Sequence, residues 1–207
     1  MSKKFDMYGY DEIATNVFNK IYPVLAKQII ENTQIKNGRC VDIGSGAGHL
    51  GKEVAKITDM EVVLYDLSED SKVISSKKII DENLEDRVFS LVGDVKDMPF
   101  DDNSMNLVIS RASYKFWGDL EKSFKEIYRI LKPGGKTYIG GGFGSRELKD
   151  EIEATMFSRK DKKWVKGKKR IPADKFKSEF IKIFKNINID KYKFIIDETG
   201  EWIIITK

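Results

Sequence analysis

The sequence predicts an α/β fold in which a doubly wound, mostly parallel sheet ends in an antiparallel hairpin. Short apolar runs alternate with stretches of helical periodicity between residues 37 and 139, which is typical of a parallel sheet with helices on both faces. A glycine-rich turn directly follows the first of these runs. The last two apolar runs, 192–196 and 202–206, are too close in sequence for a parallel crossover, so they must form a hairpin.

Size and composition favour one soluble domain. The chain has 207 residues, of which 41% are hydrophobic and 34% charged, and no apolar run reaches the ~20 residues that span a bilayer. We therefore expect no membrane partner. The N-terminus lacks the apolar stretch of a secretory signal, so we expect a cytoplasmic protein. Cys40 is the only cysteine, which excludes an intrachain disulfide, and its apolar run predicts a buried side chain.

The N-terminal third predicts a helical cap followed by one β-α-β unit. Residues 1–36 contain an amphipathic pattern, and the apolar run 40–43 reads as the first strand. Helical spacing over 49–58 and a second strand over 61–65, which ends at Asp66, complete the unit.

The alternation then continues to the C-terminal region. Its elements are, in order, a helix capped by Ser68, strands at 88–92 and 105–110, a helix at 120–131 stopped by Pro133-Gly134-Gly135, and a strand at 136–139. A further helix, with Phe176, Phe180 and Phe184 on one face, precedes the hairpin.

The loop after the first strand is the first candidate ligand site. Ligands of open parallel sheets bind beyond the carboxyl ends of the strands, near the point where strand order reverses. Gly44, Gly46 and Gly48 allow a sharp turn and a close approach of the backbone to a ligand. The run Gly46 to Gly51 also fits the G-x-G-x-x-G pattern of dinucleotide enzymes. Asp66 could bind the ribose hydroxyls of a dinucleotide or of another nucleoside ligand.

Three further features distinguish a site for a positively charged nucleoside ligand from a site for a dinucleotide. Asp42, inside the first strand, could balance a ligand that carries an ammonium and a sulfonium, whereas it would repel a pyrophosphate. Gly93-Asp94 ends the third strand, where a carboxylate could meet an adenine amino group. Finally, Leu131-Lys132-Pro133-Gly134-Gly135 leads into the fifth strand.

In this combination the sequence resembles the class I S-adenosylmethionine-dependent methyltransferases. The resemblance covers roughly residues 38 to 206 and implies a seven-stranded sheet whose last strand is antiparallel, as in the hairpin inferred above. It also implies one methyltransferase domain over 1–207. We divide this domain into a helical cap (1–36), a cofactor-binding core (37–142), a substrate-side insert and helix (143–186) and the hairpin (187–207).

The resemblance further implies roles for single residues. Gly44, Ser45, Gly46 and Gly48 would pass beneath the methionine part of the cofactor, and Asp42 would act on its amino group. Asp66 would bind the ribose hydroxyls, Leu67 would pack on the adenine, and Gly93, Asp94 and Val95 would read its edge. Ser110 and Arg111 would lie beside the methionine and the methyl group. His49, the only histidine, is expected behind the ligand contacts or facing solvent.

The acceptor pocket is expected in the loops after the fourth and fifth strands. Arg111, set among Tyr114, Phe116, Trp117 and Phe143, would receive a small anionic or aromatic substrate, because guanidinium binds carboxylates in a bidentate way. The alternative is that Arg111 pairs with an internal carboxylate while the aromatic residues belong to the core. Methyl transfer mainly needs positioning, so no catalytic residue is assigned. No metal site is expected.

The basic segment Ser158 to Arg170 leaves a second class of acceptor open. Eight of its thirteen residues are Lys or Arg, and Trp164 lies among them, so it could bind RNA or another nucleic acid. The alternative is a solvated charged loop. A non-catalytic S-adenosylmethionine-binding protein and, more remotely, a dinucleotide oxidoreductase also remain. The sequence does not indicate the oligomeric state.

Overall fold

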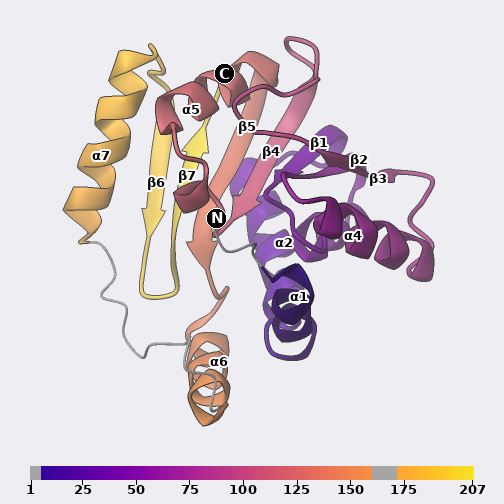
Figure 1. Ribbon diagram of the computed structural model, residues 1–207. Coiled ribbons are helices and arrows are strands. Elements are labelled where there is room, and N and C mark those ends of the chain that lie inside the picture. The colour runs from indigo at the N-terminus through magenta and orange to yellow at the C-terminus, as the bar shows by residue number, and fades with distance from the viewer. Residues whose placement is uncertain (1–5, 160–171) are drawn as a thin grey trace, which may run out of the picture.

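A seven-stranded sheet forms the centre of the protein (Figure 1), in the order β3-β2-β1-β4-β5-β7-β6. The computed structural model describes residues 6–159 and 172–207. The strands are β1 (Asn37–Ile43), β2 (Asp59–Asp66), β3 (Val88–Val92), β4 (Met105–Arg111), β5 (Leu131–Gly142), β6 (Tyr192–Ile196) and β7 (Gly200–Ile205). Strands β1 to β5 are parallel, and β7 runs antiparallel to both of its neighbours. This order confirms the predicted fold class, including the C-terminal hairpin.

Helices cover both faces of the sheet. They are α1 (Met7–Asn16), α2 (Ile21–Thr33), α3 (His49–Lys56), α4 (Glu69–Asp81), the 3-10 turn η1 (Tyr114–Phe116), α5 (Leu120–Ile130), α6 (Arg146–Ser158) and α7 (Ala173–Asn186). The apolar residues of α2, α3, α4 and α6 form one cluster with one face of the sheet. Those of α5 and α7 form a second cluster with the other face.

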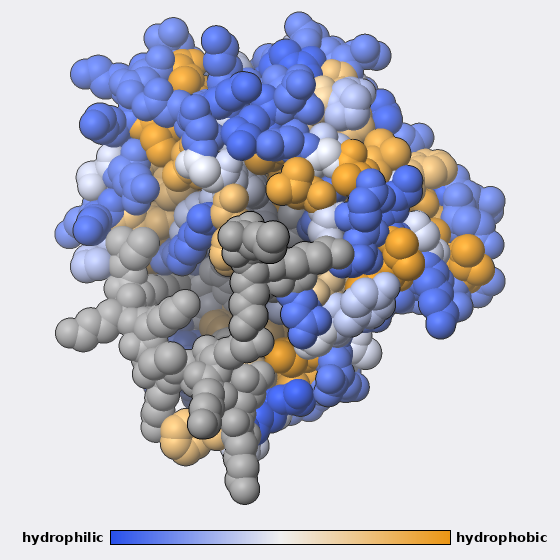
Figure 2. Space-filling view, in the orientation of Figure 1, coloured by the Kyte–Doolittle hydropathy of each residue, from blue (hydrophilic) through white to orange (hydrophobic). Residues whose placement is uncertain are grey.

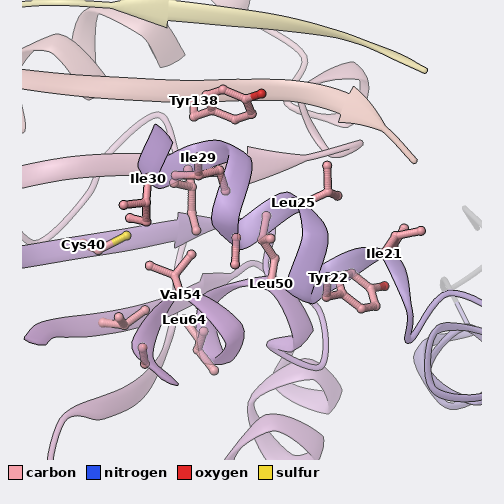
Figure 3. Close-up of a cluster of buried hydrophobic side chains, with 14 of the residues drawn as sticks. Ile21, Tyr22, Leu25, Ile29, Ile30, Cys40, Leu50, Val54, Leu64 and Tyr138 are labelled. Carbon is pink, nitrogen blue, oxygen red and sulfur yellow. The ribbon is translucent and has the colours of Figure 1, made fainter. Parts of the chain in front are cut away.

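Helix α2 shows how the apolar pattern fixes the packing of the cap. Its buried residues Leu25 and Ile29 recur at a spacing of four, which places them on one side of the helix. Figure 3 shows these side chains pointing toward Leu50 and Val54 of α3, with the ring of Tyr138 from β5 nearby. The predicted helical cap thus consists of two helices, and α2 is bound firmly to the core.

The end of β5 differs from the sequence prediction. Helix α5 ends at Ile130, before Pro133 as predicted, but the strand already begins at Leu131 and continues to Gly142. The glycines 140–142, which were expected in a loop, therefore lie in β5 and pair with β7. Gly140 also pairs with Arg111 of β4. Glycine has a low strand propensity, so the pairing with neighbouring strands, and not the local sequence, reveals this part of the strand. Helix α6 was also not anticipated.

The connection between β3 and β4 contains no helix. One consequence is that Phe89 and Leu91 of the edge strand β3 remain 42% and 39% exposed. Hydrophobic side chains reach the surface near β3 (Figure 2). Within the described ranges, no helix has both the length and the apolar character to cross a membrane.

Candidate functional site

The candidate site lies where the strand order reverses. Strand β1 pairs with β2 on one side and with β4 on the other, so the carboxyl ends of β1 and β4 are neighbours. This is the position at which open α/β sheets bind ligands. A cavity of about 40 Å³ lies at this edge. Its lining consists of Tyr10, Tyr22, Asp42, Gly44, Ser45, Gly46, Ala47, His49, Leu50 and Arg111.

The glycine loop adopts a backbone that other residues rarely take. Gly44, Gly46 and Gly48 have φ values of 66°, 54° and 76°, all in the left-handed region. A Cβ atom at Gly48 would overlap Leu64, whereas a Cβ atom at Gly46 would meet only the Met7 side chain, at 3.5 Å. Packing therefore requires glycine at 48, while at 46 the backbone conformation requires it.

Asp66 connects the glycine loop to helix α4. Its Oδ2 accepts a hydrogen bond from the Gly46 amide at 2.9 Å. Its Oδ1 accepts from the Ser68 amide at 2.9 Å and from the Ser71 hydroxyl at 3.0 Å. Each carboxylate oxygen has two lone pairs, so Oδ2 can still accept a hydrogen bond from a ligand.

The remaining residues expected at the adenosine end lie at the ends of β2 and β3. Leu67 is 71% exposed, and Val95 is buried in the core on the α5 and α7 face. Oδ1 of Asp94 accepts a hydrogen bond from the Lys96 amide at 2.9 Å. A Cβ atom at Gly93 would overlap the ring of Tyr65, so packing alone explains this glycine.

Asp42 is a buried acid that lines the cavity. It is 2% exposed, and its Oδ2 accepts a hydrogen bond from the Gly51 amide at 2.9 Å. The pKa of this carboxyl is raised to about 7, because burial outweighs the opposing Gly51 hydrogen bond and the nearby Asp66 adds to the upward shift. Near neutral pH, Asp42 is therefore available in both protonation states.

Arg111 faces the same cavity, between two aromatic rings. Its guanidinium carbon lies 5.4 Å from the ring centroid of Phe18 and 5.6 Å from that of Tyr22, within the range of cation–π contacts. Its Nε donates a hydrogen bond to the Gly142 carbonyl at 3.1 Å. Both rings come from the N-terminal cap, whose sequence carries only an amphipathic pattern, so sequence reasoning missed them.

The other residues expected in the acceptor pocket do not gather around Arg111. Tyr114 and Trp117 are buried in the core on the opposite face of the sheet, with α5 and α7. Phe116 is 81% exposed. Phe143 packs against the cluster on the same face as α2. The structure thus separates these aromatic residues, although they are close in sequence or at adjacent strand ends.

Two serines join the loop after β4 to the end of β1. The hydroxyls of Ser110 and Ser113 donate to the Ile43 carbonyl at 2.8 and 3.0 Å and lie 2.6 Å from each other. The indole nitrogen of Trp117 donates to Ser113 Oγ at 3.1 Å. Ser113, which the sequence did not single out, therefore holds the loop beside the cofactor-side strand.

His49 connects the glycine loop region to the cap. Its Nε2 lies 2.8 Å from Oδ1 of Asp11 in α1, and its ring stacks on Tyr22 at 5.0 Å. Lys78 Nζ lies 3.1 Å from the same Asp11 oxygen. Burial lowers the pKa of His49, and the hydrogen bond to Asp11 partly offsets this effect. The side chain is 15% exposed.

Of the basic segment, only Ser158 and Arg159 belong to the described residues. Arg159 Nη2 lies 3.4 Å from Oε1 of Glu12. The expectations for the remainder, including Trp164, fall outside the described ranges.

Comparison with known proteins gives near full-length structural matches. A crystal structure of a candidate S-adenosyl-L-methionine-dependent methyltransferase from Methanococcus maripaludis is 41% identical, with a TM-score of 0.92. The match covers 100% of this chain and 97% of that one. A family model for a methyltransferase domain matches residues 41–139.

Curated relatives match over shorter stretches. The demethylmenaquinone methyltransferase of Chlorobaculum tepidum is 38% identical over 49% of this chain and 39% of its own length. Phosphoethanolamine N-methyltransferase 2 of Caenorhabditis elegans is 31% identical over 77% of this chain and 36% of its own length. The chain thus spans about two fifths of the curated relatives it matches.

Proposed function

Because this chain belongs to the class I S-adenosylmethionine-dependent methyltransferases, we propose that it transfers the methyl group of S-adenosylmethionine to a small-molecule acceptor. The observation that carries the proposal is that Asp42 and Arg111 line one cavity beside the glycine loop.

The residues of this cavity fit the amino acid end of the cofactor. That end has an ammonium and a carboxylate on one carbon, and the cavity offers a buried acid and a guanidinium. Asp42 would hold the ammonium. Arg111 would hold the carboxylate with its terminal N–H groups, because its Nε already donates to Gly142. A buried charge is stable only when it is paired, which favours this assignment for Asp42.

The adenosine end would extend along the ends of β2 and β3. Asp66, fixed by the Gly46 and Ser68 amides, would accept hydrogen bonds from the ribose hydroxyls. Leu67 would cover the adenine, and Asp94 with the Val95 amide would bind its edge. An adenine packed against Leu67 would explain why this apolar side chain is exposed in the ligand-free protein.

The chain's own task in the reaction is positioning. When bound, S-adenosylmethionine supplies a methyl group that is activated by its sulfonium sulfur. The glycine loop and the Ser110–Ser113 contacts fix the two loops between which cofactor and acceptor would meet. Helices α1 and α2 cover the site and exclude water.

The named relatives support a small-molecule acceptor. By name, the Chlorobaculum tepidum enzyme acts on demethylmenaquinone and the Caenorhabditis elegans enzyme on phosphoethanolamine. Arg111 lines the cavity beside the glycine loop, so we assign its charge to the cofactor. The expectation of an anionic or aromatic acceptor rested mainly on Arg111 and is therefore weakened. An RNA acceptor bound by residues 158–170 and a non-catalytic cofactor-binding protein stay alternatives.

Labelled cofactor distinguishes these possibilities. The protein would be incubated with S-adenosylmethionine tritiated on its methyl group, together with either a small-metabolite filtrate or total RNA from the source cells. We expect label in a small molecule and an equal amount of S-adenosylhomocysteine. Arg111→Ala should lower kcat/KM for the cofactor at least about tenfold, which is the cost of losing one charge-assisted contact. Lys125→Ala, at an exposed position of α5, should leave kcat/KM unchanged. Label in RNA, or no S-adenosylhomocysteine with any fraction, would refute the proposal.

A further inference from the structure

A second buried acid, Glu201, lies outside the cofactor cavity. It is near the start of β7, directly opposite Gly141 of β5. Its side chain is 9% exposed, and its Oε1 lies 3.3 Å from the Tyr114 hydroxyl. Burial and the neighbouring carboxylate raise the pKa of Tyr114, so the phenol keeps its proton and donates it in this hydrogen bond.

An ammonium group already occupies the space beside this pair. The Nζ atom of Lys115 lies 3.7 Å from Glu201 Oε1 and 5.5 Å from the ring centroid of Tyr114. A carboxylate beside an aromatic face is a combination that binds ammonium groups. The Lys115 side chain is 54% exposed, and such an ion pair contributes at most about 1 kcal/mol. Lys115 can therefore give way to an ammonium group of a ligand.

The three glycines at the end of β5 show where a ligand has room. A Cβ atom at Gly140 would overlap the backbone of Glu201, and one at Gly142 would come within 3.1 Å of Gly200. At Gly141 a Cβ atom would meet only Ala112, at 3.8 Å, which is an ordinary contact, and the backbone there is not left-handed. Neither packing nor conformation requires glycine at 141. Its missing side chain leaves room next to Glu201.

This position adjoins the cofactor side of the molecule. The Ala112 amide donates to the Gly140 carbonyl at 2.6 Å, and the next residue, Ser113, is in contact with Gly44 of the glycine loop. In Figure 1 the carboxyl end of β5 lies between the end of β4 and the start of β7. The loop 112–114 thus touches the glycine loop on one side and Glu201 on the other.

We propose that Glu201, Tyr114 and Gly141 form a subsite for an ammonium group carried by the methyl acceptor. Glu201 supplies the charge, Tyr114 orients the carboxylate and offers its ring, and Gly141 leaves room for the ligand. Lys115 holds the subsite closed until the amine displaces it. This inference rests on the proposed function and names the class of its acceptor.

Ligand-observed NMR on the full chain saturated with S-adenosylhomocysteine tests the subsite. The probes are the cations ethanolamine and choline, and ethylene glycol serves as the uncharged control compound. We expect both cations to bind and the glycol not to bind. Glu201→Gln should weaken cation binding at least about tenfold, which corresponds to about 1.4 kcal/mol, while its affinity for S-adenosylhomocysteine stays within about twofold of wild type.

Two further variants keep the test independent of folding defects. Lys115→Ala should bind the cations more tightly, because the Lys115 ammonium no longer competes for Glu201. Lys125→Ala makes the same charge change at an exposed position of α5 and should match wild type. Gly141→Ala should fold normally and lose cation binding. The proposal is overturned if neither cation binds wild type, if Glu201→Gln binds them equally well, or if Lys115→Ala binds them no more tightly. Failure to bind S-adenosylhomocysteine would instead count against the proposed function.

Discussion

At the scale of a single residue, Asp42 makes the proposed cofactor site sensitive to pH. Burial moves its pKa from the usual range of aspartate to about 7. The unfolded chain therefore releases this proton at lower pH than the folded protein. Between about pH 4 and pH 7 the carboxyl lowers the stability of the ligand-free protein as pH rises. An ammonium in the cavity reverses this preference, because it favours the ionised form.

Cofactor affinity should therefore rise with pH. With a pKa of about 7, the ionised fraction of Asp42 increases about tenfold from pH 6 to pH 8, and the affinity for S-adenosylhomocysteine should increase by a similar factor. Titration calorimetry of wild type and Asp42→Asn across this range measures the effect. The variant should bind more weakly at pH 8 and show a flat profile. A pH dependence that persists in Asp42→Asn would assign the titration to another group.

Some residues of the candidate site could be predicted from the sequence, and others could not. Asp42 and Asp66 were predicted because each has a fixed place relative to a strand end and a glycine loop. Phe18 and Tyr22 were not, because their role depends on how the cap folds back over Arg111. Glu201 was missed for the same reason: its partner Tyr114 is 87 residues away, and no local pattern records that contact.

At the scale of elements, Asp11 of α1 holds this helix against α3 and α4. Asp11 contacts both His49 of α3 and Lys78 of α4, while Met7 packs on Ala47 and Ile74. Tyr10 of α1 lines the cavity that would hold the amino acid end of the cofactor. We therefore infer that α1 moves when this end of the cofactor enters or leaves.

Removing the Asp11 contacts should speed this motion. Loss of about 1 kcal/mol of partly buried ion pairing corresponds to about a fivefold higher dissociation rate of S-adenosylhomocysteine in Asp11→Ala. Stopped-flow fluorescence measures the rate, and hydrogen exchange should show faster exchange of the α1 amides. Glu153→Ala, which removes an exposed acid of α6, is the matched control. Equal rates in the two variants would show that Asp11 does not fasten the helix.

The elements that sequence predicted best were those defined by a local signal. Ser68 caps α4 through a hydrogen bond from the Ser71 amide at 3.4 Å, and α5 ends before Pro133, both as predicted. The residues 140–142 look like a loop in sequence, because three glycines carry no β propensity. They form a strand because neighbouring strands supply pairing partners: Gly140 pairs with both β4 and β7, and Gly141 and Gly142 pair with β7. Tertiary contact overrides local preference there.

At the scale of the whole molecule, the sheet order brings the separate motifs to one edge. The end of β1 supplies the glycine loop, β2 supplies Asp66, and β4 supplies Arg111. Sequence could predict this convergence because parallel strands with right-handed crossovers leave few possible orders. It could not predict how the cap covers that edge, because Phe18 and Tyr22 meet Arg111 through contacts between residues that are far apart in the sequence.

Cofactor binding should therefore stabilise the molecule as a whole. A ligand at one hundred times its dissociation constant adds about 2.7 kcal/mol to the free energy of unfolding, and for a chain of this length that raises Tm by roughly 5–10 °C. We expect this shift with S-adenosylhomocysteine. NAD should give no shift, because its pyrophosphate would meet the Asp42 carboxylate. Asp66→Ala should lose most of the shift. Its ligand-free Tm should also fall, because its hydrogen bonds to Gly46, Ser68 and Ser71 are lost, so the shift is measured against the variant's own ligand-free Tm. If NAD raised Tm as much as S-adenosylhomocysteine, the glycine loop would have to be assigned to a dinucleotide after all.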